Sequence, residues 1–330
     1  MITWGMVGNS HDASLAVFED DQLYWAALSK DFSDVPNDPD PNWTMLEVAR
    51  QSFGPPGKII WYERPFLKTL RQWQAGQGWL YKENDIKKYL SRWGLNCEIE
   101  YTQHHLSHAA YAYYTQPHDD CAVICLDSIG EFETLTVWHG KNNELKKIHS
   151  QRYPHSLGLF YSAMTQRMGL QPQRDEYLVA KLGAKGDYNR LKDDMFKDLI
   201  YPLKKDSPKI KMRENLHRGC QWWRPDLSCD IITDPVNAFQ DIADIGAATQ
   251  HIFEQCLGHL SDWAKAKTGS HYLALAGGGA LNKQAVQLIE PKWNDVWVPT
   301  NPGDPGSCIG AVLATTRTKI ELDRQWYQKL

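Results

Sequence analysis

A pattern of short strands that occurs twice along the chain restricts the possible folds more than any other feature. Three strands joined by tight turns open the sequence, and three more follow residue 120 in the same arrangement. These six strands are expected at residues 2–8, 13–18, 22–28, 121–127, 133–139 and 143–150. The two halves share no convincing sequence identity, so the order of elements alone indicates a duplication. It predicts a duplicated α/β fold with two lobes and a cleft between them.

The remaining segments are assigned from hydrophobic period and turn residues. The clearest helical period lies in residues 239–265, where apolar side chains recur on one face. Further helices are expected at residues 43–53, 81–93, 156–169, 175–183, 187–199, 279–289 and 305–317, and further strands at 58–62, 97–102, 271–276 and 295–298. Because 330 residues exceed the usual size of one core, we expect a first lobe at 1–117 and a second at 118–330. The second lobe carries a basic, tryptophan-containing insertion at about 200–238.

Composition argues against several classes of protein. The net charge of −4 provides no global field that favours nucleic acid. No phosphate-loop sequence G-x-x-x-x-G-K-[ST] is present, which argues against nucleotide kinase chemistry. The seven cysteines contain no C-x-x-C pair and suit reduced thiols in a cytosol. Without a signal peptide or an apolar run near the roughly 18 residues of a membrane span, a cytoplasmic protein with no membrane partner is expected.

Two histidines one helical turn apart mark the first candidate site. His104 and His108 are four residues apart, so on a helix they lie on one face and can hold one metal ion. The apolar run 121–126 reads as a buried strand that Asp127 closes. A carboxylate at that strand end, facing the helix, would complete a metal or phosphate site. The spacing leaves open the alternative of two unrelated surface or core histidines.

A glycine run marks the second candidate site. A predicted strand runs into Gly277, Gly278 and Gly279 and then into a helix, so it offers bare backbone N–H groups and a helix N-terminus to an anion. A glycine turn that binds no ligand is the alternative. Further on, Asp304 precedes an apolar helix, and its carboxylate either caps that helix or points into the cleft.

Seven segments, in this order along the chain, resemble the O-carbamoyltransferase family that includes nodulation-factor and antibiotic-tailoring enzymes. They are Asn9-Ser10-His11-Asp12-Ala13-Ser14, His104-His105-Leu106-Ser107-His108-Ala109-Ala110, Leu126-Asp127-Ser128-Ile129-Gly130-Glu131, Ser156-Leu157-Gly158-Leu159-Phe160-Tyr161-Ser162, Glu176-Tyr177, Gly277 to Asn282, and Gly303-Asp304-Pro305-Gly306. The resemblance implies an amino-terminal domain of the actin/sugar-kinase/Hsp70 (ASKHA) fold, related to the metalloprotein of tRNA threonylcarbamoylation. It also implies a metal-dependent carbamoyltransferase.

The resemblance assigns roles to several of these residues. It implies one divalent metal ion, Fe(II), Mn(II) or Zn(II). Two imidazoles and two carboxylates would hold this ion: His104, His108, Asp127 and Asp304. Such a metal acts as a Lewis acid on the carbamoyl C=O group. The turn 277–279, with Asn282, resembles the family's nucleotide-binding or adenylate-binding turn. His11 or Asp12 is expected to take the proton from the acceptor hydroxyl, or else only to brace the first turn.

Two departures from the family pattern concern the carbamoyl donor. Family members carry a carboxyl-terminal domain that makes carbamoyl-adenylate from carbamoyl phosphate and ATP, and this sequence resembles a compact form without it. The resemblance therefore predicts either direct use of carbamoyl phosphate without ATP or an adenylate supplied by another protein. In place of the family's Gly-Leu-Ala-Pro-Tyr-Gly, the chain carries Lys181 and Lys185, four residues apart. They are expected to hold a phosphate, with a solvated helix face as the alternative.

Two basic stretches with interleaved tryptophans point to the acceptor. Residues 201–225 carry seven Lys and Arg against two acidic residues, a net charge of +5, and residues 62–93 carry seven against three, a net charge of +4. Cations with aromatic rings suit a phosphate backbone with an extruded base, so Trp222, Trp223 and Arg224 are predicted to bind the acceptor. Two solvated faces with core tryptophans are the alternative.

The acceptor that fits best is the hydroxymethyl group of 5-hydroxymethylcytosine in DNA. The chain resembles compact, phage-associated DNA-modifying carbamoyltransferases, which would act in the host cytoplasm. A small-molecule hydroxyl, on a sugar or antibiotic, is the second hypothesis. A non-catalytic ASKHA subunit that binds a partner is the third, and the intact set of four ligand residues argues against it.

Overall fold

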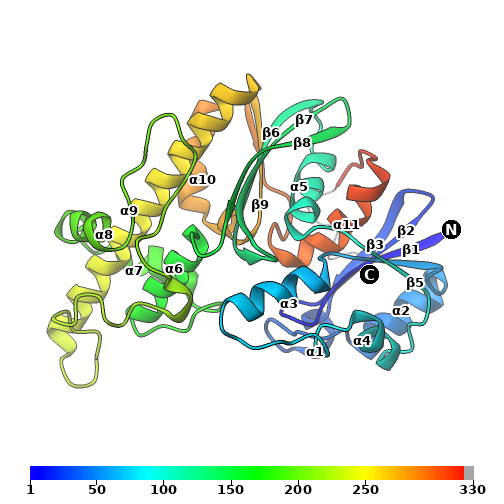
Figure 1. The fold of residues 1–330 in the computed structure, drawn as a ribbon, viewed down its shortest axis with the longest axis horizontal. Helices are drawn as coiled ribbons and strands as arrows, with labels where there is room; N and C mark the ends of the chain where they lie inside the picture. Colours follow the sequence, from blue (N-terminus) through cyan, green and yellow to red (C-terminus); the bar gives the residue numbers. More distant parts are fainter. Residues whose placement is uncertain (323–330) are drawn as a thin grey trace.

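A computed structural model of the chain describes residues 1–322 and contains two five-stranded sheets (Figure 1). The strands are β1 (Ile2–Val7), β2 (Ser14–Glu19), β3 (Gln22–Leu28), β4 (Lys58–Trp61), β5 (Glu98–Tyr101), β6 (Asp120–Gly130), β7 (Glu133–Lys141), β8 (Glu144–Arg152), β9 (Tyr272–Ala276) and β10 (Asp295–Trp297). The order is β3-β2-β1-β4-β5 in one sheet and β8-β7-β6-β9-β10 in the other. In both, the first three strands of the set are antiparallel and the rest add in parallel. The predicted duplicated α/β fold is confirmed.

Helices lie between the sheets and on their outer faces (Figure 1). They are α1 (Lys30–Ser33), α2 (Trp43–Phe53), α3 (Pro65–Gln74), α4 (Ile86–Arg92), α5 (His104–Tyr114), α6 (Leu157–Arg167), α7 (Glu176–Gly183), α8 (Lys192–Asp198), α9 (Pro235–Thr268), α10 (Lys283–Ile289) and α11 (Ser307–Thr316). Helix α5 packs on the second sheet, α11 packs on the first, and the two helices pack against each other between the sheets. Among residues 1–322, no helix is long and apolar enough to cross a membrane.

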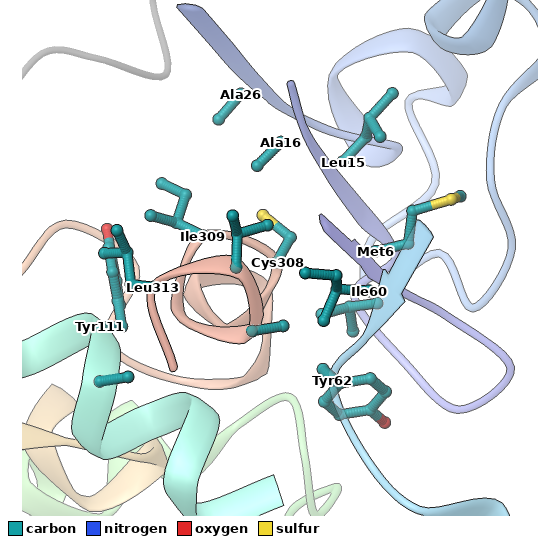
Figure 2. Close-up of a cluster of buried hydrophobic side chains, with 14 of the residues drawn as sticks. Met6, Leu15, Ala16, Ala26, Ile60, Tyr62, Tyr111, Cys308, Ile309 and Leu313 are labelled. Carbon is teal, nitrogen blue, oxygen red and sulfur yellow. The ribbon is translucent and has the colours of Figure 1, made fainter. Parts of the chain in front are cut away.

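The last helix returns to the first sheet. Cys308, Ile309 and Leu313 of α11 lie in one buried cluster with side chains of β1, β2, β3 and β4 (Figure 2). Helix α11 also lies close to α5, because Gly310 has no side chain at their contact. A Cβ atom at this position would lie 2.0 Å from the Ser107 carbonyl oxygen. The predicted division at residue 117 assigned this helix to the second lobe. Its apolar side chains pack on the first sheet, so this helix contacts the core of the first predicted lobe.

Helix α3 has no counterpart among the predicted helices. Its first position is Pro65, which suits a helix start, but its buried face carries Lys68 and Arg71 instead of an apolar stripe. Both cations are buried because acceptors of the protein surround them: Lys68 Nζ lies 2.7 Å from Glu63 Oε1, and Arg71 Nε donates to the Glu131 carbonyl oxygen. The apolar side chains Phe66 and Trp73 recur at helical spacing but are exposed, so the apolar period of this helix does not mark its buried face.

The second lobe is built around the long helix α9. It starts at Pro235, where the Asp234 side chain accepts a hydrogen bond from Asn237 N–H, and it ends at Gly269 in the left-handed region. The helix is longer at both ends than the predicted 239–265. Residues 200–238 contain little regular structure, yet they are anchored in the same core as α9. Buried side chains of this segment include Ile210, Met212, Leu216, Cys220, Trp223 and Leu227.

Candidate metal centre

The two histidines of the sequence motif lie on one face of α5. Most of this helix is buried because it packs between α11 and the second sheet. His104 and His108 are one helical turn apart, and their Nε2 atoms are 3.1 Å apart. The two imidazoles therefore present a nitrogen each to one small volume.

Two carboxylates from distant parts of the chain meet these nitrogens. Asp127 lies where the regular pairing of β6 with β7 is interrupted, and its Oδ2 is 3.1 Å from His104 Nε2. Asp304 Oδ1 is 3.4 Å from His104 Nε2 and 3.3 Å from His108 Nε2. One possible ligand atom from each of the four residues lies within 4.8 Å of the others. The structure thus brings together all four residues that the family resemblance implies as ligands.

The segment that carries Asp304 is held from both lobes. Ser14 in β2 donates its hydroxyl to the Pro305 carbonyl oxygen at 2.8 Å, and Gly277 N–H donates to the Pro302 carbonyl oxygen at 2.7 Å. Asp304 caps no helix, since Gly306 occupies the cap position of α11. Of the two orientations that the sequence left open, the structure has the carboxylate directed at the histidines.

The donor atoms suit a divalent transition metal in type and spacing. Two imidazoles with two carboxylates form a mixed N/O set that Fe(II), Mn(II) and Zn(II) all accept. A metal bonded at about 2.1 Å keeps neighbouring donors roughly 3.0 Å apart in octahedral and 3.4 Å apart in tetrahedral geometry. The donor pairs given above lie at 3.1–3.4 Å. The residues therefore fit the metal that the family resemblance implies.

The charges of the site also favour a cation. Burial opposes ionisation of Asp127, but its hydrogen bond with His104 lowers the pKa to about 2. Burial likewise opposes ionisation of Asp304, and the imidazoles of His104 and His11 hold its pKa well below its usual range. Both carboxyl groups are therefore anionic at neutral pH, inside a site from which water is largely excluded.

A second layer of residues contacts the far sides of the two imidazoles. Ser307 Oγ lies 3.2 Å from His108 Nδ1, and Glu63 Oε2 lies 3.7 Å from His104 Nδ1. Glu63 is buried; burial works against its ionisation, but Lys68 lowers its pKa to about 2. Neither residue could be identified from the sequence. A lone serine before an apolar helix and a lone glutamate after a strand carry no distinctive spacing.

His11 and Asp12 lie at the edge of this centre. His11 Nδ1 is 2.9 Å from Asp12 Oδ2, and His11 Nε2 is 3.6 Å from Asp304 Oδ2. Burial lowers the pKa of His11, but the neighbouring Asp304 and Asp12 carboxylates outweigh it and raise the pKa to about 9. A cation bound to Asp304 would offset part of that negative charge. The pair has the arrangement of an imidazole oriented by a carboxylate, with one ring nitrogen toward the centre.

The glycine turn approaches the same centre from the second lobe. Gly277 has φ +81°, and a Cβ atom there would lie 2.1 Å from the Leu126 carbonyl oxygen. A Cβ atom at Gly278 would lie 3.6 Å from Asp127 Oδ1, so the bare backbone borders the carboxylate. Within residues 1–322, the N–H groups of Gly278 and Gly279 donate to no acceptor. Two free donors beside a cation site form a place for an anionic group.

Of the other predicted donor-binding residues, Asn282 adjoins this turn through a backbone hydrogen bond to Gly279. The Asn282 side chain caps α10 by accepting from Ala285 N–H and forms a two-way amide pair with Gln250 of α9, so it binds the protein itself. Lys181 and Lys185 are exposed at the end of α7, and neither side chain forms a hydrogen bond or an ion pair within the described part of the chain. Lys185 instead lies over the ring of Phe239. These surroundings are those expected for the alternative given above, a solvated helix face.

The three predicted acceptor-binding residues have different surroundings. Trp222 is 55% exposed and available for stacking. The prediction for Trp223 is wrong, because its ring is buried in the core of the second lobe and its Nε1 donates to Asp198. The guanidinium group of Arg224 is paired with Asp194 and Asp226, which neutralise it locally. Adjacent positions of an irregular segment point to opposite sides, and composition cannot tell which side is buried.

Comparisons with known proteins show which proteins this chain is similar to. Residues 62–313 match the family described as carbamoyltransferase N-terminus. The uncharacterized protein sll1178 of Synechocystis is 31% identical over 276 residues, which cover 79% of this chain and 44% of that protein. The nodulation protein NolNO of Sinorhizobium fredii is 26% identical over 220 residues, 65% of this chain and 31% of that protein. The chain thus spans less than half the length of these relatives.

A solved structure supports the fold. The activator of the 2-hydroxyisocaproyl-CoA dehydratase from Clostridium difficile has a TM-score of 0.50 with this chain at 12% sequence identity, and the match covers 96% of both chains. Likeness at this identity concerns the fold alone. Together with the two sheets of equal topology, it confirms the ASKHA fold predicted from the sequence.

Proposed function

The chain belongs to the carbamoyltransferase family, whose N-terminal domain it contains, and on that premise we propose that it transfers a carbamoyl group from carbamoyl phosphate or carbamoyl-adenylate to an acceptor hydroxyl. One observation carries the proposal: four ligand-type side chains converge beside a glycine turn with two free N–H groups. Burial of these polar and charged side chains costs free energy unless they gain a partner, which supports a bound cation.

The metal bound by His104, His108, Asp127 and Asp304 would supply Lewis acidity toward the carbamoyl oxygen. Residues of the chain would do the rest. Gly278 and Gly279 N–H groups donate to the anionic end of the donor. His11 Nε2 accepts the proton of the acceptor hydroxyl, while Asp12 holds the proton on Nδ1. The acceptor oxygen then bonds to the carbamoyl carbon, and the C–O bond to the leaving group breaks. The leaving group, which is phosphate from carbamoyl phosphate or AMP from carbamoyl-adenylate, takes the electron pair of that bond.

Turnover assays with defined components test this proposal. Purified protein is incubated with carbamoyl phosphate and one of Fe(II), Mn(II) or Zn(II), with and without ATP, and the acceptor is analysed by mass spectrometry. Gain of one carbamoyl group only with a metal supports the proposal. Activity without ATP supports direct use of carbamoyl phosphate, and strict dependence on ATP supports the adenylate. No transfer to any hydroxyl acceptor, with metal bound, contradicts the proposed activity.

Replacing His11 tests the assignment of the base. We expect His11→Gln to lower kcat about 100-fold, the lower end of the effect of general acid–base catalysis, because the amide cannot accept the proton. The metal affinity should stay unchanged, since His11 is not one of the four converging residues. Kinetics and metal titration of the same preparation separate the two effects. Wild-type kcat in this variant would show that the residue only braces the turn.

For the acceptor, we propose the hydroxymethyl group of a modified pyrimidine in DNA. The two basic stretches are far apart in sequence, yet they touch: a Cβ atom at Gly76, just after α3, would lie 3.2 Å from Arg218 Nη2. Large exposed aromatic side chains occur in both stretches, as a phosphate backbone with an extruded base requires. They are Phe66, Trp73, Trp79, Tyr81, Tyr201 and Trp222, with Trp79 and Tyr81 stacked on each other.

A comparison of acceptors decides between this and the small-molecule hypothesis. Duplex DNA containing 5-hydroxymethylcytosine is compared with sugars and aminoglycosides under the same metal and donor conditions. Carbamoylation of the DNA base alone supports the proposal, and activity on the small hydroxyls alone contradicts it. A protein that binds metal but modifies neither class would favour the non-catalytic subunit.

Replacing Trp222 tests the acceptor surface. Loss of one stacking ring costs about 1–3 kcal/mol of binding, so Trp222→Ala should raise KM for DNA by roughly 10-fold. The thermal midpoint should stay within about 1 °C because the side chain is largely exposed. Trp43→Ala is the matched control, since Trp43 is 54% exposed on α2, outside both basic stretches. Equal KM values for both variants and the wild type would remove Trp222 from the acceptor site.

A further inference from the structure

The buried pair Glu63–Lys68 lies directly behind one of the metal-binding imidazoles. Glu63 follows β4, Lys68 lies on the inner face of α3, and their charged atoms are 2.7 Å apart with both side chains under 10% exposed. Replacing a buried ion pair by apolar residues of similar volume is often neutral or stabilising. A contribution to folding stability therefore does not explain why this pair is buried here, and its neighbours suggest another explanation.

His104 has an unsatisfied atom on the side that faces this pair. Its Nδ1 is buried and has no hydrogen-bond partner within residues 1–322, while Glu63 Oε2 lies 3.7 Å away. When Nε2 of an imidazole binds a metal, the ring proton must sit on Nδ1, which becomes a donor. The nearest acceptor for that donor is the Glu63 carboxylate, which needs to move roughly 1 Å to reach hydrogen-bond distance.

The two imidazoles are supported differently. His108 Nδ1 faces the hydroxyl of Ser307, a neutral partner, whereas His104 Nδ1 faces a carboxylate. A carboxylate behind a ligating histidine fixes the ring orientation and makes the metal-facing nitrogen more basic. Lys68 Nζ also lies 3.3 Å from the Asn9 carbonyl oxygen, in the turn that carries His11. The pair therefore touches both the metal side and the acceptor side of the site.

We propose that Glu63 is a positioning residue of the metal centre. It accepts the Nδ1 proton of His104 and holds the Nε2 lone pair toward the ion, while Lys68 fixes Glu63 and ties it to the turn at Asn9. This inference rests on the proposed function in that it needs the four residues to bind a metal. It adds a residue that contacts neither metal nor substrate.

Metal titration of the apo protein tests the assignment. The chain is freed of metal and titrated with Fe(II), Mn(II) or Zn(II) alone against a competing chromophoric chelator. Glu63→Gln should raise the Kd for the metal about 10- to 100-fold, the loss found when the partner behind a ligating histidine is changed. Glu133→Gln is the matched control, because Glu133 forms a comparable ion pair with Lys147 on the β7–β8 hairpin and contacts no ligand residue.

A second variant and a second readout keep the test decisive. Glu63→Gln combined with Lys68→Met removes both charges, so no unpaired cation stays buried, and the same rise in Kd with a wild-type thermal midpoint is expected. Long-range ¹H–¹⁵N spectra should show His104 protonated on Nδ1 in the metal-bound wild type. Wild-type Kd values in both variants would overturn this inference alone. Failure of the wild type to bind any of the three metals would overturn it together with the metal dependence of the proposed function.

Discussion

Asp304→Asn is expected to abolish metal binding under assay conditions and to lower the rate of carbamoyl transfer about a thousandfold or more. The Asp304 carboxylate lies within 3.4 Å of both ligand imidazoles and within 3.6 Å of His11 Nε2. An amide has nearly the same shape but lacks the negative charge that the cation needs. Loss of a Lewis acid removes several kcal/mol of transition-state stabilisation, which corresponds to at least this factor in rate.

Metal titration and transfer kinetics of the same preparation check this expectation. Asp295→Asn is the control, because Asp295 is an exposed aspartate that pairs with His118 away from the centre. That variant should bind metal and react as the wild type does. If Asp304→Asn keeps its metal and its rate, the four side chains are not a metal centre, whatever their spacing.

Gly310→Ala is expected to destabilise the folded protein by roughly 3 kcal/mol and to lower the thermal midpoint by roughly 5–10 °C. The added methyl group would lie 2.0 Å from the Ser107 carbonyl oxygen, which is backbone and cannot rotate away. Helices α5 and α11 must therefore separate, although they pack closely between the sheets. Because α5 carries both histidines and α11 follows Asp304, metal affinity should fall as well.

Calorimetry with and without metal checks the effect, and Gly258→Ala provides the control. Gly258 lies within α9, where a Cβ atom would meet only Lys292 Nζ at 3.9 Å. Alanine has the better helix propensity, so this variant should gain about 0.5–1 kcal/mol. A wild-type midpoint for Gly310→Ala would mean that α5 and α11 do not pack as closely as described. The position of Asp304 next to the histidines would then be contradicted as well.

The sheets could be predicted from the sequence because their signals are local. Each strand of the two meanders carries its own apolar run and turn residues, and the predicted and observed bounds agree within a few residues. The buried face of α3 could not be predicted in this way, since the apolar Phe66 and Trp73 are exposed while Lys68 and Arg71 occupy that face. Their burial depends on Glu63 and on the backbone at Glu131, which come from other elements. Contacts with other elements, and not the local sequence pattern, therefore decide which face of α3 is buried.

For the residues of the site, too, the sequence predicts only what local spacing determines. The pair His104 and His108 could be found from spacing, because one helix presents both side chains. Asp304 was linked to the histidines only through the family motif, since no periodic rule connects it to α5 across nearly two hundred positions. Glu63 was not found at all, because its relation to His104 exists only after β4 and α5 have packed. Trp222 and Trp223 are neighbours in sequence with opposite burial, which the three-dimensional core decides.

The return of α11 to the first sheet has a consequence for biosynthesis. A ribosome delivers the chain from its amino terminus, so strands β1 to β5 emerge long before residues 307–316 arrive to cover them. A nascent chain can thus contain His104, His108 and Asp127 before the helix that packs on the first sheet has been made. Asp304 and α11 therefore reach the first sheet and the proposed metal site only in a late stage of translation.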